Sequence, residues 1–313
     1  MKIVITDCGF ANIFPETAAI TEAGFELAYA QCKTADDVMS AAADADGIMV
    51  QFAPVTAEVI YSLSRCKVIV RYGIGVDNVD LAVAKAKGIP VCNVPDYCID
   101  EVADHTVALA LAHARQLFQI DARTRAGVWK IIPDKPMPSF NDMTFATAGY
   151  GRIARAVLDR ARAFGFKIAA YDPYVLPANE EVASLSLDEL FRQADILSLH
   201  VPLSPETKHL VNAERLAQMK PTAILVNTAR GGLIDTVALS EALQSGTIAA
   251  AGLDVFEYEP LEEDHPLRKS PNALLTSHMA WFSEKSVPKL QRLAAEEAIR
   301  ALQGKPLRNQ VNK

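Results

Sequence analysis

Three polar side chains stand at or near the ends of late apolar runs in the sequence. Arg230 follows "LVNTA", Glu259 lies in "LDVFEYEP", and His278 ends "LLTSH". A histidine can take a proton from a hydroxyl group or return it, because its ordinary pKa lies near neutrality. A carboxylate beside the ring would stabilise the imidazolium, and a guanidinium would bind a substrate carboxylate through paired hydrogen bonds. The three types together would suit hydride transfer at a carbinol carbon, in which histidine would serve as the base for the hydroxyl proton.

Each of these residues also has a structural interpretation that the sequence leaves open. Arg230 could cap a helix or pair with Asp235, and Glu259 lies in an acidic stretch, 257–264, that could be a solvated loop. No His, Cys and carboxylate spacing matches a common metal site, so we expect no metal. The presence of a histidine does not by itself identify His278 as a functional residue. The chain has five others: His105, His113, His200, His209 and His265.

Two glycine pairs compete for the role of a dinucleotide phosphate loop. In "TAGYGRIAR", Gly149 and Gly151 lie between an apolar run and a helical pattern, and Ala154 takes the third position of the fingerprint. The first glycine permits a tight turn and the second lets the backbone approach a pyrophosphate at the helix N-terminus. The next apolar run ends in Asp172, and an acid there binds ribose hydroxyls and repels the 2'-phosphate of NADP. This loop therefore favours NAD(H) over NADP(H).

The second pair, Gly73 and Gly75 in "RYGIGVDN", has less support. Its third position is Asn78, and no acid directly ends the following strand. An ordinary strand–helix turn is the structural interpretation of both loops, so the pattern favours the loop at 149–154 without deciding alone.

Apolar runs that alternate with helical patterns must position these groups. Strands joined by helices of this length form parallel sheets, and ligands bind beyond the carboxyl ends of such strands. A longer helical pattern at 99–127 predicts a bridge into a second domain, and a last helix at 283–304 could return to the first. The expected strands are 2–6, 25–30, 47–52, 67–72, 89–94, 144–149, 167–172, 195–201, 223–229, 249–255 and 273–278, with further helices at 186–194 and 236–246.

The composition excludes several classes of protein. A chain of 313 residues suits two domains, and a net charge of -7 argues against a nucleic-acid partner. No apolar run reaches the roughly 18 residues of a membrane span, so we expect no membrane partner. The five cysteines form no C-x-x-C pair, which predicts reduced, partly buried thiols in a cytoplasmic protein.

Seven motifs, in their order and spacing, carry a resemblance to a known family. They are "RYGIGVDNVDL", "GYGRIARAV", "AYDP", "HVPLSPETKHLVN", "NTARGGLID", "AGLDVFEYEP" and "LLTSHMAW". From about residue 45 to its end, the chain resembles the NAD-dependent D-2-hydroxyacid dehydrogenases. "CNVPDYCIDEVADHT" and "HMAWFSEKSV" look closest to the branch of the C-terminal-binding proteins, which are NAD-binding corepressors.

The resemblance implies an α/β fold of two doubly wound parallel-sheet domains with a cleft between them. A flavodoxin-like substrate domain would comprise 1–98 plus 282–313, and a Rossmann NAD-binding domain would comprise 99–281. The family dimerises mainly through the nucleotide domain, which implies a homodimer that uses the long helix near 100–118.

The resemblance also implies residue roles for a small-molecule 2-oxo or 2-hydroxy acid. Arg230 would bind the carboxylate and carbonyl, His278 would be the general acid or base, and Glu259 would raise the pKa of His278. The substrate would also meet the backbone of Gly73, Ile74 and Gly75, together with Arg71 and Trp281. The residues implied for NAD are Thr106, Gly149, Tyr150, Gly151, Arg152, Ile153, Asp172, Pro173, Val201, Pro202, Thr207, Thr228, Ala229 and Asp254, with Asp254 facing the carboxamide.

Some positions depart from the family pattern without removing a catalytic group. Asp104 replaces a common glutamate, Ser277 a common proline, and Ala146 and Ala154 common glycines. The strand "TFATA" before the phosphate loop is where we expect this protein to differ. Trp281 is typical of the corepressor branch, although it could instead be a hinge residue packed between domains.

Two functions compete at this point. The intact trio favours a working dehydrogenase or reductase over an NAD(H)-sensing, corepressor-like scaffold with little turnover. Chemistry like that of formate dehydrogenase is opposed by Glu259, since that chemistry replaces the acid–histidine pair.

Overall fold

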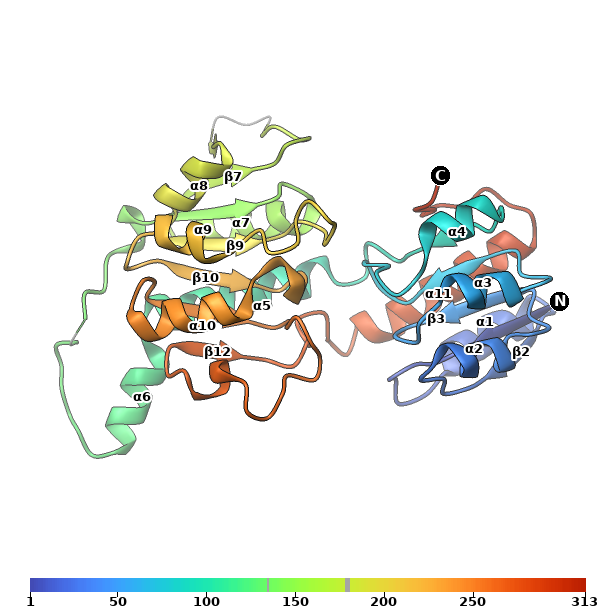
Figure 1. Ribbon diagram of the computed structural model, residues 1–313. Coiled ribbons are helices and arrows are strands. Elements are labelled where there is room, and N and C mark those ends of the chain that lie inside the picture. Colours follow the sequence, from blue (N-terminus) through green and yellow to red (C-terminus); the bar gives the residue numbers. More distant parts are fainter. Residues whose placement is uncertain (134, 178–180) are drawn as a thin grey trace. The chain divides into compact units, whose positions relative to one another are not determined.

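Short apolar strands alternate with helices along the chain and form two separate parallel sheets. The computed structural model describes residues 1–133, 135–177 and 181–313. The chain divides into two units, of which one combines Met1–Cys98 with Phe282–Lys313 and the other is Ile99–Trp281. Each sheet carries helices on its faces (Figure 1). The expected class, two parallel-sheet α/β domains, is confirmed.

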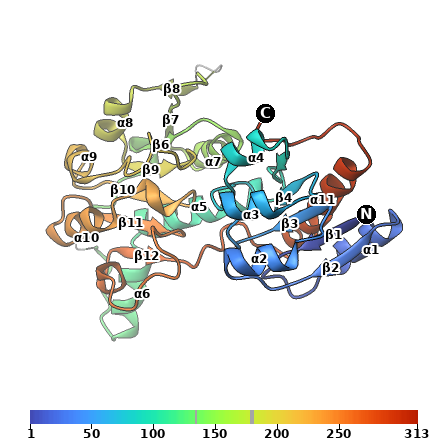
Figure 2. The same cartoon turned by 45° about the vertical axis from the view of Figure 1, so that its right-hand side comes forward.

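The first unit contains a five-stranded sheet in the order β2-β1-β3-β4-β5. This is the strand order of flavodoxin-like folds. Helices α1 and α11 pack together on one face, and α2, α3 and α4 lie on the other (Figure 2). The elements are β1 (Lys2–Ile5), α1 (Phe14–Glu22), β2 (Glu26–Tyr29), α2 (Ala35–Ala41), β3 (Gly47–Val50), α3 (Ala57–Ser62), β4 (Ile69–Arg71), α4 (Leu81–Ala86), β5 (Val91–Cys92) and α11 (Ser286–Leu302).

The second unit contains a seven-stranded sheet in the order β12-β11-β10-β9-β6-β7-β8. The chain direction of the winding reverses between β9 and β6, and ligands of such sheets bind at that switch point. Its strands are β6 (Thr144–Ala148), β7 (Lys167–Tyr171), β8 (Val182–Ser184), β9 (Ile196–Leu199), β10 (Ile224–Asn227), β11 (Ala250–Leu253) and β12 (Ala273–Leu275). Its helices are α5 (Ile99–Ala114), α6 (Leu117–Arg125), α7 (Arg152–Ala163), α8 (Leu187–Gln193), α9 (Ala213–Gln218) and α10 (Thr236–Ser245), with short 3-10 turns at Phe140–Asp142, Gly231–Leu233 and Pro266–Lys269.

Successive residues of the central strands enter two different cores of the second unit. On β10, Leu225 packs into the core under α8, α9 and α10, whereas Ile224 and Val226 pack into the core under α5 and α7. Because the sheet is buried on both faces, its strands are apolar at nearly every position. This explains the continuous apolar runs and leaves polar residues to the strand ends.

Two sequence expectations need correction. The helical pattern at 99–127 is two helices, because Gln116 has a φ of 52° between α5 and α6. That left-handed conformation interrupts a right-handed helix. The short edge strand β8 was not expected, since three residues of mixed polarity carry little periodic signal.

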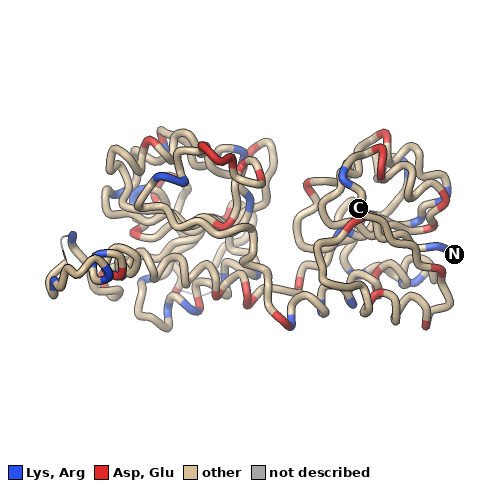
Figure 3. Tube along the Cα trace, turned by 90° about the horizontal axis from the view of Figure 1, so that it is seen from below, with Lys and Arg blue, Asp and Glu red and all other residues tan. Residues whose placement is uncertain are grey.

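The surface and the thiols are ordinary for a chain of this composition. Acidic and basic residues are mixed along the trace of each unit (Figure 3). All five cysteines are buried and free, and burial raises the pKa of Cys66 to about 11 and that of Cys92 to about 12. Within the described part of the chain, no helix has the length and apolar character needed to cross a bilayer.

Candidate active site

Arg230, Glu259 and His278 follow three strands that are neighbours in the sheet of the second unit. They come after β10, β11 and β12, whose order in the sheet is β12-β11-β10. Since parallel strands end at the same edge, the three loops that carry these residues lie side by side. The positions are therefore set by the sheet rather than by one flexible segment.

Glu259 and His278 are joined by a hydrogen bond. The Oε2 atom of Glu259 lies 2.7 Å from Nδ1 of His278, and Oε1 accepts from the backbone N–H of Phe256 at 3.0 Å. Burial acts to raise the pKa of Glu259, but the hydrogen bond and charge of His278, the Phe256 N–H and the charge of Arg230 lower it overall. An ionised carboxylate can only accept, so Nδ1 of His278 carries the hydrogen. The Nε2 atom, at the tip of the ring, is then the ring nitrogen that does not contact Glu259.

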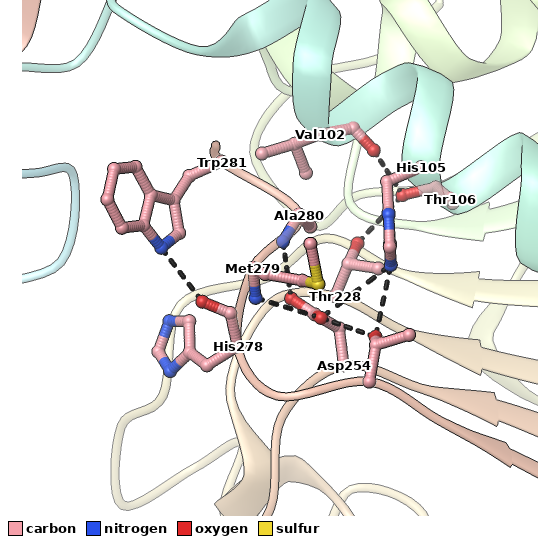
Figure 4. Close-up of polar contacts among 10 residues, drawn as sticks. Val102, His105, Thr106, Thr228, Asp254, His278, Met279, Ala280 and Trp281 are labelled. Atoms are coloured by element: carbon pink, nitrogen blue, oxygen red, sulfur yellow. Dashed lines mark hydrogen bonds and ion pairs between the residues drawn. The ribbon is translucent and has the colours of Figure 1, made fainter. Parts of the chain in front are cut away.

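The backbone of His278 is held in an unusual conformation. Its φ is 54°, a left-handed value that is uncommon for a residue with a side chain. The N–H of His278 donates to the carbonyl of Asp254 at 2.7 Å, and the indole N–H of Trp281 donates to the carbonyl of His278 at 2.8 Å (Figure 4). Both backbone polar groups of His278 are thus fixed, which directs its ring.

The loop of Arg230 is pressed against the loop of Glu259. A Cβ on Gly231 would lie 1.8 Å from the backbone carbon of Phe256, so only glycine fits there. The side chain of Asn227 donates to the carbonyl of Arg230 at 2.8 Å. The guanidinium lies near enough to Glu259 for its charge to help lower the pKa of that carboxyl. This close packing brings the trio together.

The loop between β6 and α7 has the geometry of an anion-binding turn. Gly149 has a φ of 99°, and a Cβ there would lie 2.6 Å from the carbonyl oxygen of His200. A Cβ on Gly151 would meet nothing within 4 Å, so open space adjoins the backbone at the start of α7. No side chain caps that helix, whose first N–H groups therefore point at the open space. Ala154 is fully buried, as close packing at the third fingerprint position requires.

The strand "TFATA" supplies a hydroxyl to this loop. The Oγ1 atom of Thr147, which is fully buried, donates to the carbonyl of Gly149 at 2.8 Å. The Gly149 N–H donates to the carbonyl of Tyr171 on the neighbouring strand at 2.6 Å. Thr147 therefore stabilises the turn at Gly149.

Asp172 ties the phosphate loop to the turn after β7. Its Oδ2 accepts from the N–H of Tyr150 at 2.8 Å. Its Oδ1 accepts from the N–H groups of Tyr174 and Val175 at 2.9 and 3.0 Å. The carboxylate thus sits at the end of β7 beside the loop, with lone pairs remaining for further donors.

The other residues expected at the cofactor also lie at this edge. Thr106 on α5 and Thr228 after β10 share a hydrogen bond of 2.8 Å between their hydroxyls. Thr207 closes the turn after β9 by donating to the carbonyl of Pro202 at 2.7 Å. The structure therefore gathers every cofactor residue expected from the sequence in the second unit: Thr106, Gly149 to Ile153, Asp172, Pro173, Val201, Pro202, Thr207, Thr228, Ala229 and Asp254.

The carboxylate of Asp254 accepts hydrogen bonds from the turn that carries His278. The residue is 1% exposed. Its Oδ1 accepts from the N–H of Met279 at 3.0 Å and its Oδ2 from the N–H of Ala280 at 2.9 Å (Figure 4). The implied role toward a carboxamide stays a prediction, whereas its contacts with the turn are plain.

The residues expected at the substrate lie in different units. Trp281 ends the second unit, whereas Arg71, Gly73, Ile74 and Gly75 follow β4 of the first. The carbonyl of Gly73 accepts from the N–H of Val94 at 2.9 Å, and that of Ile74 from the side chain of Asn93 at 2.6 Å. Gly73 has a φ of 132°, and a Cβ there would strike the Arg71 guanidinium at 1.9 Å. Two carbonyls of the loop are thus hydrogen-bonded, and the Arg71 guanidinium lies against Gly73.

Sequence reasoning missed several polar residues at this edge. His105 and Thr276 reach Asp254, and His209 pairs with Glu257 at 2.8 Å. Only Thr276 left a signal in the sequence, because it lies two residues before His278 at the end of a strand. Among the residues that the structure describes, no group of three His, Cys, Asp or Glu residues could hold a metal ion.

A family model and a curated relative match this chain in sequence. Residues 107–280 match the family model described as "D-isomer specific 2-hydroxyacid dehydrogenase, NAD binding domain". The D-3-phosphoglycerate dehydrogenase of Methanocaldococcus jannaschii is 39% identical over 100% of this chain, which spans only 59% of that relative.

Two solved structures are also similar over nearly the whole chain. A D-lactate dehydrogenase from Aquifex aeolicus, complexed with NAD and lactic acid, has a TM-score of 0.88, 29% identity and 96% coverage of both chains. An acyclic imino acid reductase in complex with NADPH and D-Arg has a TM-score of 0.90 and 30% identity, with coverage of 99% of this chain and 100% of that one. Closeness to the branch of the C-terminal-binding proteins stays a prediction.

Proposed function

Because the chain belongs to the D-isomer specific 2-hydroxyacid dehydrogenase family, we propose that it interconverts a 2-oxo acid and a D-2-hydroxy acid with NAD(H). The observation that carries the proposal is the Glu259–His278 hydrogen bond of 2.7 Å, at the strand ends beside Arg230. The family relatives support an oxidoreductase, whereas the roles of the individual residues are our assignment.

His278 moves the proton. With Nδ1–H donated to Glu259, a protonated Nε2 gives its hydrogen to the carbonyl oxygen during reduction of the 2-oxo acid. The neutral Nε2 takes that hydrogen back from the hydroxyl during oxidation. Glu259 keeps the ring in one tautomer and stabilises the imidazolium, which is the role of the acid in other histidine–carboxylate pairs.

Arg230 binds the carboxylate of the substrate. Its guanidinium can form two parallel hydrogen bonds with a carboxylate and polarise the adjacent carbonyl. We assign a second set of carboxylate contacts to the backbone of Gly73, Ile74 and Gly75, with Arg71 beside them, and assign Trp281 to the substrate side chain. The hydrogen bonds that hold the Gly73 and Ile74 carbonyls support the assignment of this loop to the carboxylate.

The residues of the second unit fit a nicotinamide dinucleotide. The open space at Gly151 and the uncapped start of α7 suit a pyrophosphate, and Asp172 suits ribose hydroxyls. When bound, the cofactor supplies or accepts the hydride. Asp172 favours NAD(H) over NADP(H), so Asp172→Ala should raise the ratio of NADPH to NADH affinity by about tenfold. A general disturbance of the loop would weaken both cofactors and leave the ratio unchanged.

We further propose that the protein is cytoplasmic and forms a homodimer. Exposed apolar side chains gather in and after α6, in the second unit, and their burial against a second copy would be favourable. They are Leu117, Phe118, Val128, Trp129, Ile131 and Ile132.

A screen of 2-oxo acids tests the proposed function. NADH oxidation is followed with glyoxylate, hydroxypyruvate, phenylpyruvate and branched or sugar-derived 2-oxo acids, and the product's configuration is assigned. We expect turnover with at least one acid and a D-2-hydroxy product. Tight NADH binding without turnover across the panel would instead support an NAD(H)-sensing scaffold.

A further inference from the structure

We propose that His105 is a positioning residue, which acts through Thr276 and Asp254 on the turn 276–281 that carries His278. The inference rests on the proposed function, because it assigns the purpose of the network to the placement of a catalytic histidine. His105 lies on α5, 171 residues before Thr276, and the expected site did not include either residue.

The network begins at a buried carboxylate. Besides its bonds to Met279 and Ala280, Asp254 accepts a short hydrogen bond of 2.5 Å from the hydroxyl of Thr276 at Oδ1. The carbonyl of Asp254 accepts from the N–H of His278 at 2.7 Å. Asp254 thus contacts the turn on both sides of His278, and movement of this carboxylate would move the catalytic ring.

His105 completes the network from the other side. Its Nε2 lies 3.0 Å from Oγ1 of Thr276 and 3.6 Å from Oδ1 of Asp254 (Figure 4). The next residue, Thr106, is bonded to Thr228 in the loop that leads to Arg230. One turn of α5 therefore braces the loops of both Arg230 and His278.

The direction of each hydrogen bond follows from the donors available. Thr276 has one hydroxyl hydrogen, which it donates to Oδ1 of Asp254. The oxygen of Thr276 must then accept from His105, so Nε2 of His105 carries a hydrogen. A donor on that oxygen fixes the rotation of the hydroxyl and strengthens its bond to the carboxylate. Nε2 of His105 keeps its hydrogen whether or not Nδ1 is protonated. The bond to Thr276 therefore requires a hydrogen-bond donor on residue 105 but not a charged ring.

That requirement leads to a matched set of variants. His105→Leu removes the donor, whereas His105→Gln places an amide N–H where Nε2 was. Thr276→Val removes the hydroxyl with little change of shape, and Thr276→Ser keeps it. We expect His105→Leu and Thr276→Val each to lower kcat about tenfold, with the KM for the 2-oxo acid and the Kd for NADH changed less than about threefold. His105→Gln and Thr276→Ser should stay within about threefold of the wild type.

The double variant separates a shared network from general damage. His105→Leu combined with Thr276→Val should be no slower than Thr276→Val alone, because both changes break one chain of bonds. Nitrogen NMR of the imidazole rings, without substrate, should show hydrogen on Nε2 of His105. Thermal melts confirm that each variant is folded.

Three results would overturn the inference. They are an unchanged kcat in His105→Leu, losses in the two single variants that multiply in the double variant, and a His105→Gln variant as slow as His105→Leu. His278→Ala tells this failure apart from failure of the proposed function. If His278→Ala keeps its turnover, the proposed function fails and the inference with it; if His278→Ala is inactive while His105→Leu is fully active, the inference alone fails.

Discussion

The second unit contains two histidine–glutamate pairs that look alike at first. His278 binds Glu259 at 2.7 Å and His209 binds Glu257 at 2.8 Å, and the two glutamates lie two residues apart after β11. Both histidines have left-handed backbones, with φ values of 54° and 50°. Distance and backbone shape therefore do not separate the two pairs.

The ring nitrogens do separate them. His278 uses Nδ1, the nitrogen nearer its backbone, and leaves Nε2 at the tip of the ring for a reacting oxygen. His209 uses Nε2, so the tip of its ring points at the carboxylate. The backbone N–H of His209 donates to the carbonyl of Gly232 at 2.9 Å. His209 therefore links two loops. The two pairs therefore differ in the ring nitrogen that the glutamate leaves available, and only His278 keeps Nε2 available for the proton transfer that we propose.

Arg230 is a second difference, because its charge acts on Glu259. Arg230→Gln removes the charge-assisted contact with a substrate carboxylate. We expect kcat/KM for the 2-oxo acid to fall about 100- to 1,000-fold, since a preorganised charged donor is lost. Arg162→Gln, at an exposed arginine on α7 paired with Asp159 and Glu181, is the matched control and should leave kcat/KM unchanged. Equal kinetics of the two variants would remove Arg230 from the site.

Paired substitutions of the two glutamates test the comparison itself. Glu259→Gln replaces an acceptor with an amide that can donate to Nδ1, which favours the wrong tautomer of His278. We expect kcat to fall about 100-fold. Glu257→Gln keeps an acceptor for His209, so kcat should stay within about threefold. Comparable losses in the two variants would show that the pairs are not functionally distinct.

Glu259 should also make stability depend on pH. Its pKa is lowered in the folded protein from the ordinary 4.5. The stabilisation is therefore present above the unfolded pKa and is lost as the pH falls through the folded value. The Tm difference between wild type and Glu259→Gln should be largest near pH 7 and should shrink below about pH 4. A difference that is constant with pH would contradict the ionised state of Glu259; since the side chain is partly exposed, the effect is modest.

The smallest effect is expected at the other histidine. His209→Asn keeps a residue that tolerates the left-handed backbone but loses the ring that binds Glu257. We expect kcat within about threefold of wild type and a Tm lower by a few degrees, in line with the loss of one partly exposed bond. A loss of kcat beyond tenfold would show that the His209–Glu257 pair also takes part in catalysis.

Much of the fold and site could be predicted from the sequence, because it depends on local pattern. Apolar runs predicted the strands, and the rule that ligands meet strand ends put Arg230, Glu259 and His278 at one edge. The need for glycine at position 149 is also local, because the φ there is 99°. The residue roles themselves await the measurements above.

The rest depends on contacts that no local pattern encodes. His105 and Thr276 meet only after the sheet of the second unit has formed, and the use of Asp254 by the turn 276–280 requires the fold around it. The strand "TFATA" was expected to set this protein apart, but the hydrogen bond that its Thr147 hydroxyl donates to Gly149 could not be predicted from the sequence. The left-handed backbone of Gln116 carries no signal in its residue type.

The most direct test compares His278→Ala with the wild-type protein on its best 2-oxo acid. We predict a fall in kcat of about 100- to 10,000-fold, the range for loss of a general acid–base group. NADH binding, followed by fluorescence, should change less than about threefold, because the cofactor residues that we assign lie on other loops. A His278→Ala protein that keeps more than a tenth of the wild-type kcat would contradict the assignment of the proton to His278.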